Sequence, residues 1–275
     1  MGGSTVTAAL TIVQEALYWA AAIVLLAATV AFWLEDRVAG RARQIMLAGS
    51  CLLLASAIAR WIVTGHPPIF GTFENSIASA WAISMVVVFG RRLSYVRALP
   101  ADFERWFAFW IPLTLGFGLF FTRTPYPLTI SERSIIVDIH VLFAWLAYTA
   151  LLLTSTVALL VVTRRKGWEG SAVDDVLVRG AGVGFALFTV MLGVGSLYSY
   201  LLFADWFRWE IVEAFAVAAW LGYASVLHAH MFFGWRGRKL AWVVLVVLPL
   251  LIGTFWVWSF YSTTYHHFEI PEIKA

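Results

Sequence analysis

Cysteine is almost absent from this chain of 275 residues, and charged residues are scarce. The single cysteine, Cys51, lies within an apolar run and has neither a partner for an internal disulfide nor a CxxC neighbour. We therefore expect neither thiol redox chemistry nor a thiolate metal site. Only 13% of the residues are charged, and no basic face or nucleic-acid motif is present, which excludes the nucleic-acid-binding class.

Apolar residues are what the chain has in excess: 61% of it is hydrophobic, with 15 Trp and 21 Phe. A soluble domain of this size cannot bury that much apolar surface. Apolar runs of about 20 residues recur, and that length spans a bilayer core of about 30 Å. The sequence predicts an all-α, polytopic membrane helix bundle of about eight spans, forming a single transmembrane domain over residues 1–275. The expected spans are residues 8–34, 43–65, 75–91, 107–123, 136–163, 179–203, 211–233 and 239–261.

Two of these spans have unusual features. The fourth is interrupted by Pro112 and by several glycines. The first has no basic region before it, so we expect a retained helix and not a cleaved signal peptide.

Basic residues concentrate in alternate loops between the expected spans. They are Arg37, Arg41 and Arg43; Arg91, Arg92, Arg97 and Arg105; Arg164, Arg165, Lys166 and Arg179; and Arg236, Arg238 and Lys239. The other loops are poor in basic residues. Because Lys and Arg favour the cytoplasmic side, both termini are predicted to lie outside a cell (inner) membrane, in the periplasm or at the cell exterior. The outward segments are then residues 66–74, 124–135, 203–210 and 262–275.

Histidines gather toward this outward face. Imidazole is a common iron ligand, and two imidazoles on opposite faces of a porphyrin give a six-coordinate heme. Such a pair must come from helices whose ends converge. His140 pairs on topology with His267, or with the neighbouring His266, although each residue taken singly is also compatible with an ordinary interfacial side chain. His66, beside two prolines, is interpreted as loop structure.

Ionisable residues also fall inside the expected spans. His228 lies toward the cytoplasmic end of the seventh span and is a functional candidate by its position, whereas His230 is close enough to the interface to be solvated. Arg60, near the outer end of the second span, either contacts a propionate or snorkels to the interface.

The most unusual stretch is an aromatic loop between the sixth and seventh spans. Two Trp at an interface are compatible with simple anchoring, but here an Arg sits among dense aromatics, and Glu210 and Glu213 are expected one turn apart on one face of the next helix. A flat porphyrin needs apolar surface for its rings and donors for its propionates. The candidate heme-binding residues are Trp206, Phe207, Arg208, Trp209, Glu210 and Glu213.

These motifs resemble those of the cytochrome c assembly family of heme-handling membrane proteins, most closely its CcsA (ResC-like) branch. The family's outward loop has the form W-x-W-D-P-K-E-x-W, and the matching run here is Phe207 to Phe215. Ahead of the third span, Pro68, the run Phe73 to Asn75 and Trp81 match a Pro, Tyr-Glu-Ser and Trp of the family. The run Leu227-His228 and the run Gly234 to Gly237 match a Leu-His helix end and a Gly-Trp-Arg-Gly loop. The resemblance covers roughly residues 50–270.

The resemblance implies roles for particular residues. His140 before the loop and His267 after it, with His266 as the neighbouring option, correspond to the family's outward axial heme ligands. His228 corresponds to an intramembrane histidine of an inner heme site. This chain carries Glu210 in place of the loop's Asp and Ile211-Val212 in place of Pro-Lys.

The implied function is cytochrome c biogenesis, with heme b presented at the outward face for covalent attachment to apocytochrome c. A heme lyase or synthase component is the implied enzyme class. A second membrane subunit with a large outward domain (CcsB/ResB-like) is the implied partner. Two alternatives are a heme b-carrying subunit of an electron-transfer complex and a HemX-like regulatory relative without catalysis. A transporter unrelated to heme is disfavoured, because clear inverted repeats and mid-membrane acidic residues are absent from the sequence.

Overall fold

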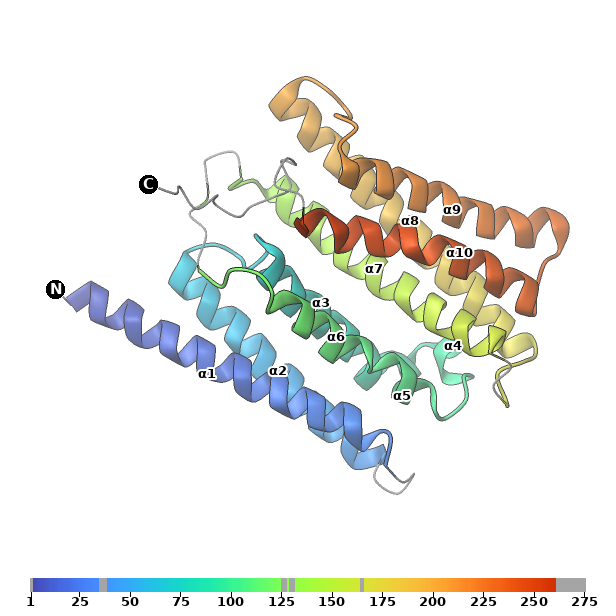
Figure 1. Cartoon of the computed structure of the whole chain (residues 1–275), viewed down its shortest axis with the longest axis horizontal. Helices are drawn as coiled ribbons and strands as arrows, with labels where there is room; N and C mark the ends of the chain where they lie inside the picture. The colour runs from blue at the N-terminus through green and yellow to red at the C-terminus, as the bar shows by residue number, and fades with distance from the viewer. Residues whose placement is uncertain (1, 35–38, 125–127, 129–131, 164–165, 261–275) are drawn as a thin grey trace. The chain divides into compact units, whose positions relative to one another are not determined.

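The computed structural model describes residues 2–34, 39–124, 128, 132–163 and 166–260, which are helical apart from turns and loops (Figure 1). Seven helical segments of the described residues are long and apolar enough to cross a membrane. They are Thr7–Ala31, Arg41–Thr64, Thr72–Arg92, Ile135–Val162, Ser171–Phe203, Ile211–Phe233 and Gly237–Phe255. With the shorter fourth segment below, the prediction of a polytopic helical bundle of about eight spans is confirmed.

The elements follow the hydropathy pattern closely at most positions. The long helices are α1 (Gly2–Ala31), α2 (Ala39–Thr64), α3 (Thr72–Phe89), α7 (Ile135–Val162), α8 (Ser171–Phe203), α9 (Ile211–Phe233) and α10 (Gly237–Phe255). The shorter elements are η2 (Gly90–Arg92), α4 (Ser94–Arg97), α5 (Phe103–Phe107), α6 (Trp110–Gly118) and η3 (Val257–Phe260).

The fourth predicted span, residues 107–123, is not one helix. Within it the structure has α6 (Trp110–Gly118), and α5 (Phe103–Phe107) ends at its first residue. A turn joins the two helices, in which Ala108 N–H donates to the Glu104 carbonyl and Ile111 N–H donates to the Ala108 carbonyl. Pro112 falls in the first turn of α6, where a missing N–H is tolerated, so the helix restarts just before it. The predicted start at residue 107 was wrong, because a proline in an apolar run is compatible with the first turn of a new helix as well as with a break in a longer one.

The start of α8 also differs from the prediction, by eight residues: the helix begins at Ser171 and not at 179. Its first two turns carry Asp174 and Asp175, which lowered the hydropathy there. Arg179 Nε donates to the Asp175 carboxylate at 2.7 Å, one turn apart on the helix. A hydropathy pattern marks only the apolar part of a helix, and α8 begins eight residues before its apolar part.

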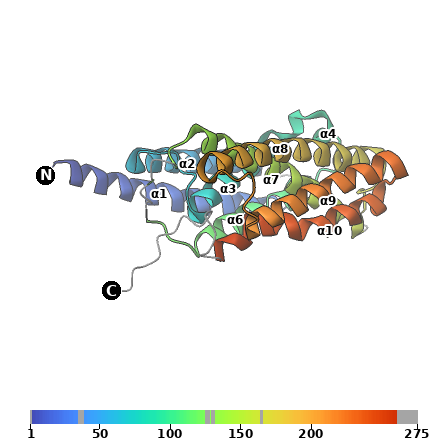
Figure 2. The same cartoon turned by 90° about the horizontal axis from the view of Figure 1, so that it is seen from above.

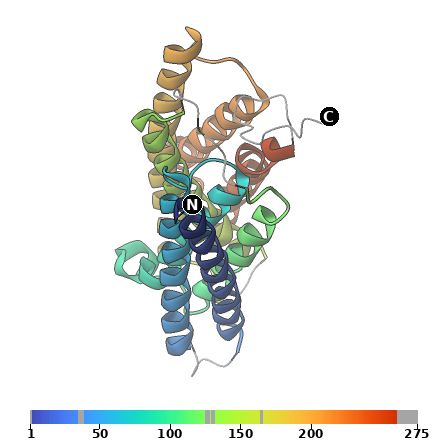
Figure 3. The same cartoon turned by 90° about the vertical axis from the view of Figure 1, so that its left-hand side faces the viewer.

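The chain divides into two compact units: Met1–Leu93 with Ala101–Pro127, and Ser94–Pro100 with Leu128–Ala275. We call them unit 1 and unit 2. In unit 1, α1 and α2 run side by side, α2 packs on α3, and α3 packs on α6 (Figure 3). Leu25 of α1 lies against Gly49 of α2, and the hydroxyls of Ser50 and Ser84 hydrogen-bond at 2.8 Å between α2 and α3.

In unit 2, α7 packs antiparallel to α8, and α10 packs on both α7 and α9 (Figures 1 and 2). Three glycines of α8 face α7 at positions where any Cβ would strike an α7 side chain. The pairs are Gly180 with Thr154, Gly184 with Leu151, and Gly195 with His140. We call this line of contacts the glycine seam. Small residues let two membrane helices approach closely, so the seam explains the tight α7–α8 pair.

One end of unit 2 collects the start of α7, the end of α8, the start of α9 and the end of α10. The Tyr148 ring of α7 stacks on Phe255 of α10 at 4.0 Å, and Phe215 of α9 lies against Gly253 of α10. We call this the loop end of unit 2, because it carries the connection between α8 and α9.

Candidate functional site

His140 lies in the second turn of α7, at the loop end of unit 2. Its Nδ1 is 2.9 Å from the main-chain carbonyl of Met191 in α8. A carbonyl only accepts, so Nδ1 carries the hydrogen. The neutral ring then has its lone pair on Nε2, the nitrogen that a metal ion would use. The side chain is half-buried.

The predicted aromatic loop connects α8 to α9 at the same end. Trp206 stacks on Tyr200 of α8 with ring centroids 4.5 Å apart, and Phe207 and Trp209 contact each other at 5.7 Å. Trp206 is 54% exposed and Trp209 68% exposed, so both present large apolar surfaces outside the helix packing. Eight residues of α8 separate Gly195, which lies beside His140, from the loop, a rise of about 12 Å along the helix.

The loop backbone is strained at two places. Ala204 (φ 59°) and Trp209 (φ 56°) adopt left-handed conformations, and they are the only non-glycine residues with positive φ in the described part of the chain. Ala204 ends α8 at the position where glycine is usual. A bulky residue such as Trp209 rarely adopts this conformation, and strain of this kind concentrates at functional sites.

The charged residues of the loop have distinct surroundings. Glu213 is buried in the first turn of α9, and its Oε2 accepts a hydrogen bond from the Arg208 backbone N–H at 2.8 Å. The Arg208 guanidinium lies 4.3 Å from the centre of the Phe203 ring. Glu210 is the N-cap residue of α9 with extended backbone and not a residue of the helix, which corrects the expectation that Glu210 and Glu213 share a helix face. Glu213 therefore anchors the loop that Arg208 belongs to.

The structure does not bring His228 to this cluster. It lies 15 residues beyond Glu213 along α9, about 22 Å away by helical rise, where its side chain is exposed and its Nδ1 donates to the Ala224 carbonyl at 2.8 Å. His230 Nδ1 donates to the carbonyl of Trp235 at 3.0 Å, so it closes the turn after α9 and is not merely solvated. His266 and His267 lie outside the described residues.

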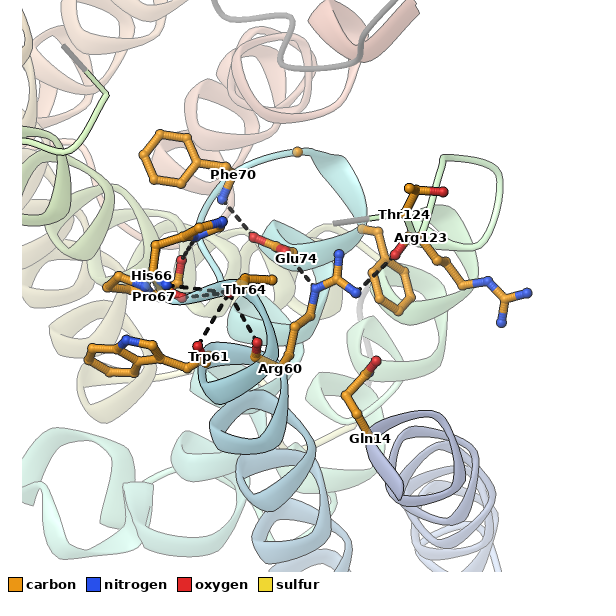
Figure 4. A network of polar contacts seen from close by, with 12 residues as sticks. Gln14, Arg60, Trp61, Thr64, His66, Pro67, Phe70, Glu74, Arg123 and Thr124 are labelled. Atoms are coloured by element: carbon orange, nitrogen blue, oxygen red, sulfur yellow. Dashed lines mark hydrogen bonds and ion pairs between the residues drawn. The ribbon is translucent and has the colours of Figure 1, made fainter. Parts of the chain in front are cut away.

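The motif at the start of α3 supplies Glu74, in the first turn of that helix, to a buried ion pair in unit 1 (Figure 4). Arg60 Nε donates to the Glu74 carboxylate at 2.5 Å, and both side chains are at most 3% exposed. Arg60 Nη1 donates to the Arg123 carbonyl at 2.9 Å, and Glu74 Oε2 accepts from the Phe70 N–H at 3.0 Å. This burial rules out snorkelling by Arg60, and its guanidinium is engaged by protein acceptors. His66, also buried, bonds the Pro67 carbonyl in the same loop.

A second buried carboxylate lies near η2 and α5 of unit 1. Arg91 binds Glu104 through two hydrogen bonds of 2.8 Å, and Arg43 contacts the same carboxylate. Burial raises the pKa of Glu104, but the hydrogen bonds and charge of Arg91, with the charge of Arg43, outweigh it, so that pKa lies below the usual glutamate value. The ionised Glu104 carboxylate therefore links α5, in which it lies, to Arg91 of η2 and Arg43 of α2.

Sequence reasoning missed three groups of the His140 region: the Met191 carbonyl, Gly195 and Tyr200. The only sequence signal for them was the helical spacing of the glycines in α8. Among the described residues, no cluster of three or more His, Cys, Asp or Glu side chains is arranged to hold a metal ion. The groups at the loop end instead suit a ligand that takes one imidazole and a broad aromatic surface.

Comparison with known proteins identifies relatives along most of the chain. The family model described as "Cytochrome C assembly protein" matches residues 17–264. A protein named "Cytochrome c biogenesis protein CcsA" from Synechococcus sp. (strain CC9605) is 27% identical over 272 residues, which cover 83% of this chain and 87% of that protein. The like-named protein of Synechococcus sp. (strain RCC307) is 26% identical over 268 residues, covering 80% of this chain and 83% of the relative.

Proposed function

Because the chain belongs to the cytochrome c assembly protein family, we propose that it works in cytochrome c biogenesis by binding heme b at the outward membrane face and presenting it to apocytochrome c. The name of its relatives, cytochrome c biogenesis protein CcsA, supports a role in this process. The seven apolar helices support a multi-pass membrane location. The periplasmic or exterior position of the site follows from the distribution of basic residues between loops.

The observation that carries the proposal is the geometry of His140. Its Nδ1–H bond to the Met191 carbonyl leaves Nε2 as the nitrogen with a lone pair, which is the state required for iron ligation. It lies at the loop end of unit 2, where the α8–α9 loop supplies aromatic surface. His267, or its neighbour His266, provides the second axial imidazole in this proposal, since the chain leaves α10 and η3 at the same end.

The loop residues fit the rest of the ligand. The exposed rings of Trp206 and Trp209, with Phe207, form the surface for the porphyrin face. The Arg208 guanidinium is the donor for a propionate, because Arg binds carboxylates through paired hydrogen bonds. Glu213 and Glu210 shape the loop from the start of α9. His228, well away along α9, belongs to an inner heme site on the delivery route.

In this proposal the site brings heme and apocytochrome c together, and their reactive groups determine the chemistry. Each cysteine thiol of an apocytochrome adds across a heme vinyl group: a C–S bond forms, and the thiol hydrogen ends on the other vinyl carbon. This addition is redox-neutral and needs no nucleophile from this chain. The protein's part is to hold and orient the porphyrin in a lyase or synthase complex. A second membrane subunit with a large outward domain (CcsB/ResB-like) completes the assembly.

The test is a reduced-minus-oxidised absorption spectrum of the purified protein beside a His140→Ala, His267→Ala double variant. We expect a low-spin b-type spectrum in the unmodified protein and its loss in the variant. The single variants His266→Ala and His267→Ala, with His140 kept, identify which of the two tail histidines matters. A spectrum unchanged in the double variant would overturn the assignment of His140, and one unchanged in both single variants would overturn that of the tail histidines.

A second experiment separates presentation from permanent binding. Deletion of the protein in its host is expected to remove mature c-type cytochromes, and the bound heme is expected to exchange. Normal cytochrome c maturation together with non-exchanging heme would instead identify an electron-transfer subunit. Normal maturation with a heme-free protein would identify a regulatory relative.

A further inference from the structure

The His140 ring occupies the last position of the glycine seam toward the loop end of unit 2. A Cβ built on Gly195 would lie 2.7 Å from Cε1 and 2.8 Å from Nδ1 of His140. Real Cβ atoms are essentially never that close to another heavy atom. The imidazole keeps its observed place only because residue 195 has no side chain.

The same α8 turn supplies the hydrogen-bond acceptor. The Met191 carbonyl, four residues before Gly195, accepts the Nδ1–H of His140 at 2.9 Å. A Cβ at position 195 would therefore clash with His140 Nδ1, the same atom that hydrogen-bonds to the Met191 carbonyl. Any side chain at 195 must push the ring away from the Met191 carbonyl.

We propose that Gly195 and the Met191 carbonyl form a positioning site for the His140 imidazole, fixing its tautomer and its orientation toward iron. The inference rests on the proposed function, because it deepens the role given to His140. Partners that bond the second nitrogen of a ligating histidine set its orientation and basicity, and their loss typically weakens metal binding about 10–100-fold. Gly195 contacts the ring and not the ligand, so it acts through His140.

The chain offers a matched control in the same helix. Gly193 is two residues away in α8, and a Cβ there meets nothing within 4 Å. Gly193→Ala and Gly195→Ala make the same chemical change, with the same gain in helix propensity. The clash at 195 is with a side-chain ring that can rotate, and not with backbone, so we expect both variants to fold.

The experiment titrates hemin into detergent-purified protein freed of heme and follows the low-spin absorption bands on reduction. The proteins are the unmodified chain, His140→Ala, Gly195→Ala, Gly193→Ala and the His140→Ala, Gly195→Ala double variant. We expect Gly195→Ala to weaken low-spin binding about 10–100-fold and Gly193→Ala to leave it unchanged. The double variant should bind like His140→Ala alone, since Gly195 acts through that ring.

The outcomes separate the two proposals. Low-spin binding that survives His140→Ala removes the ligand assignment, and the positioning site falls with it. Loss in His140→Ala with Gly195→Ala equal to Gly193→Ala leaves ligation standing and overturns the positioning site. A Gly195→Ala effect that adds to that of His140→Ala in the double variant also overturns it, because it shows a general packing role for Gly195.

Discussion

The Arg60–Glu74 ion pair of unit 1 is buried and held by protein partners, whereas the loop end of unit 2 has exposed aromatic rings and a strained backbone. Arg60 and Glu74 are at most 3% exposed and are held by protein partners. Trp209, in contrast, is 68% exposed in a left-handed conformation. We infer that the buried ion pair of unit 1 contributes mainly to the free energy of unfolding, whereas the exposed rings of unit 2 contribute mainly to ligand binding. Substitutions should separate the two quantities.

The largest expected effect is in unit 1. Glu74→Gln leaves the buried Arg60 charge without its counter-ion, which should lower the free energy of unfolding by about 3–5 kcal/mol. The control is Glu15→Gln, which breaks the Glu15–Arg123 pair; those side chains are 31% and 43% exposed, so the loss should stay below about 1 kcal/mol. Thermal or denaturant unfolding of the purified protein measures both. Equal losses would show that burial adds nothing to the Arg60–Glu74 pair.

A smaller effect is expected at Glu104, and it should depend on pH. The folded pKa of Glu104 lies below the usual glutamate value of about 4.3, so its stabilisation is present above that value and lost as the pH falls through the folded pKa. Glu104→Gln should cost about 2 kcal/mol at neutral pH, where charged hydrogen bonds to Arg91 are removed. Unfolding curves of the variant and the unmodified chain should converge at a pH below the folded pKa. A difference that is constant with pH would contradict an ionised Glu104.

The smallest stability effect should come from unit 2 and have the opposite sign. Glycine relieves left-handed strain of about 1 kcal/mol but adds unfolded-chain entropy worth about 0.5 kcal/mol, so Trp209→Gly and Ala204→Gly should each gain about 0.5 kcal/mol. Only Trp209→Gly removes aromatic surface, and it should weaken hemin binding up to about tenfold while Ala204→Gly does not. Equal hemin affinity in the two variants would remove Trp209 from the proposed site.

The sequence was enough to predict the elements that are decided by local composition. The seventh span, residues 211–233, coincides with α9, because an apolar run there ends at Gly234 in a left-handed cap. The start of α8 was missed, since its acidic first turns lie outside the apolar run. The sequence predicts an interruption at Pro112, whereas this residue lies in the first turn of α6, which begins at Trp110.

The candidate site was predictable by residue type but not by contact. The aromatic loop and His140 stood out through composition and order along the chain. The bond from His140 to the Met191 carbonyl joins residues 51 apart, and no local pattern encodes it. Likewise, the hydrogen bond from the Arg208 backbone N–H to the Glu213 carboxylate could not be read from the sequence. Such assignments depend on how α7, α8 and α9 pack, which composition does not specify.

The acceptor for His140 is a main-chain atom, and this has a consequence for how the chain tolerates sequence drift. A carbonyl is supplied by every amino acid, so the side chain at position 191 is free to change within the limits of its buried volume. Position 195 has no such freedom, since every replacement for glycine intrudes on the ring. Two positions one turn apart on the same helix therefore contact the same histidine under opposite steric constraints. We expect substitutions of Met191 to leave the hydrogen bond in place and substitutions of Gly195 to displace the His140 ring.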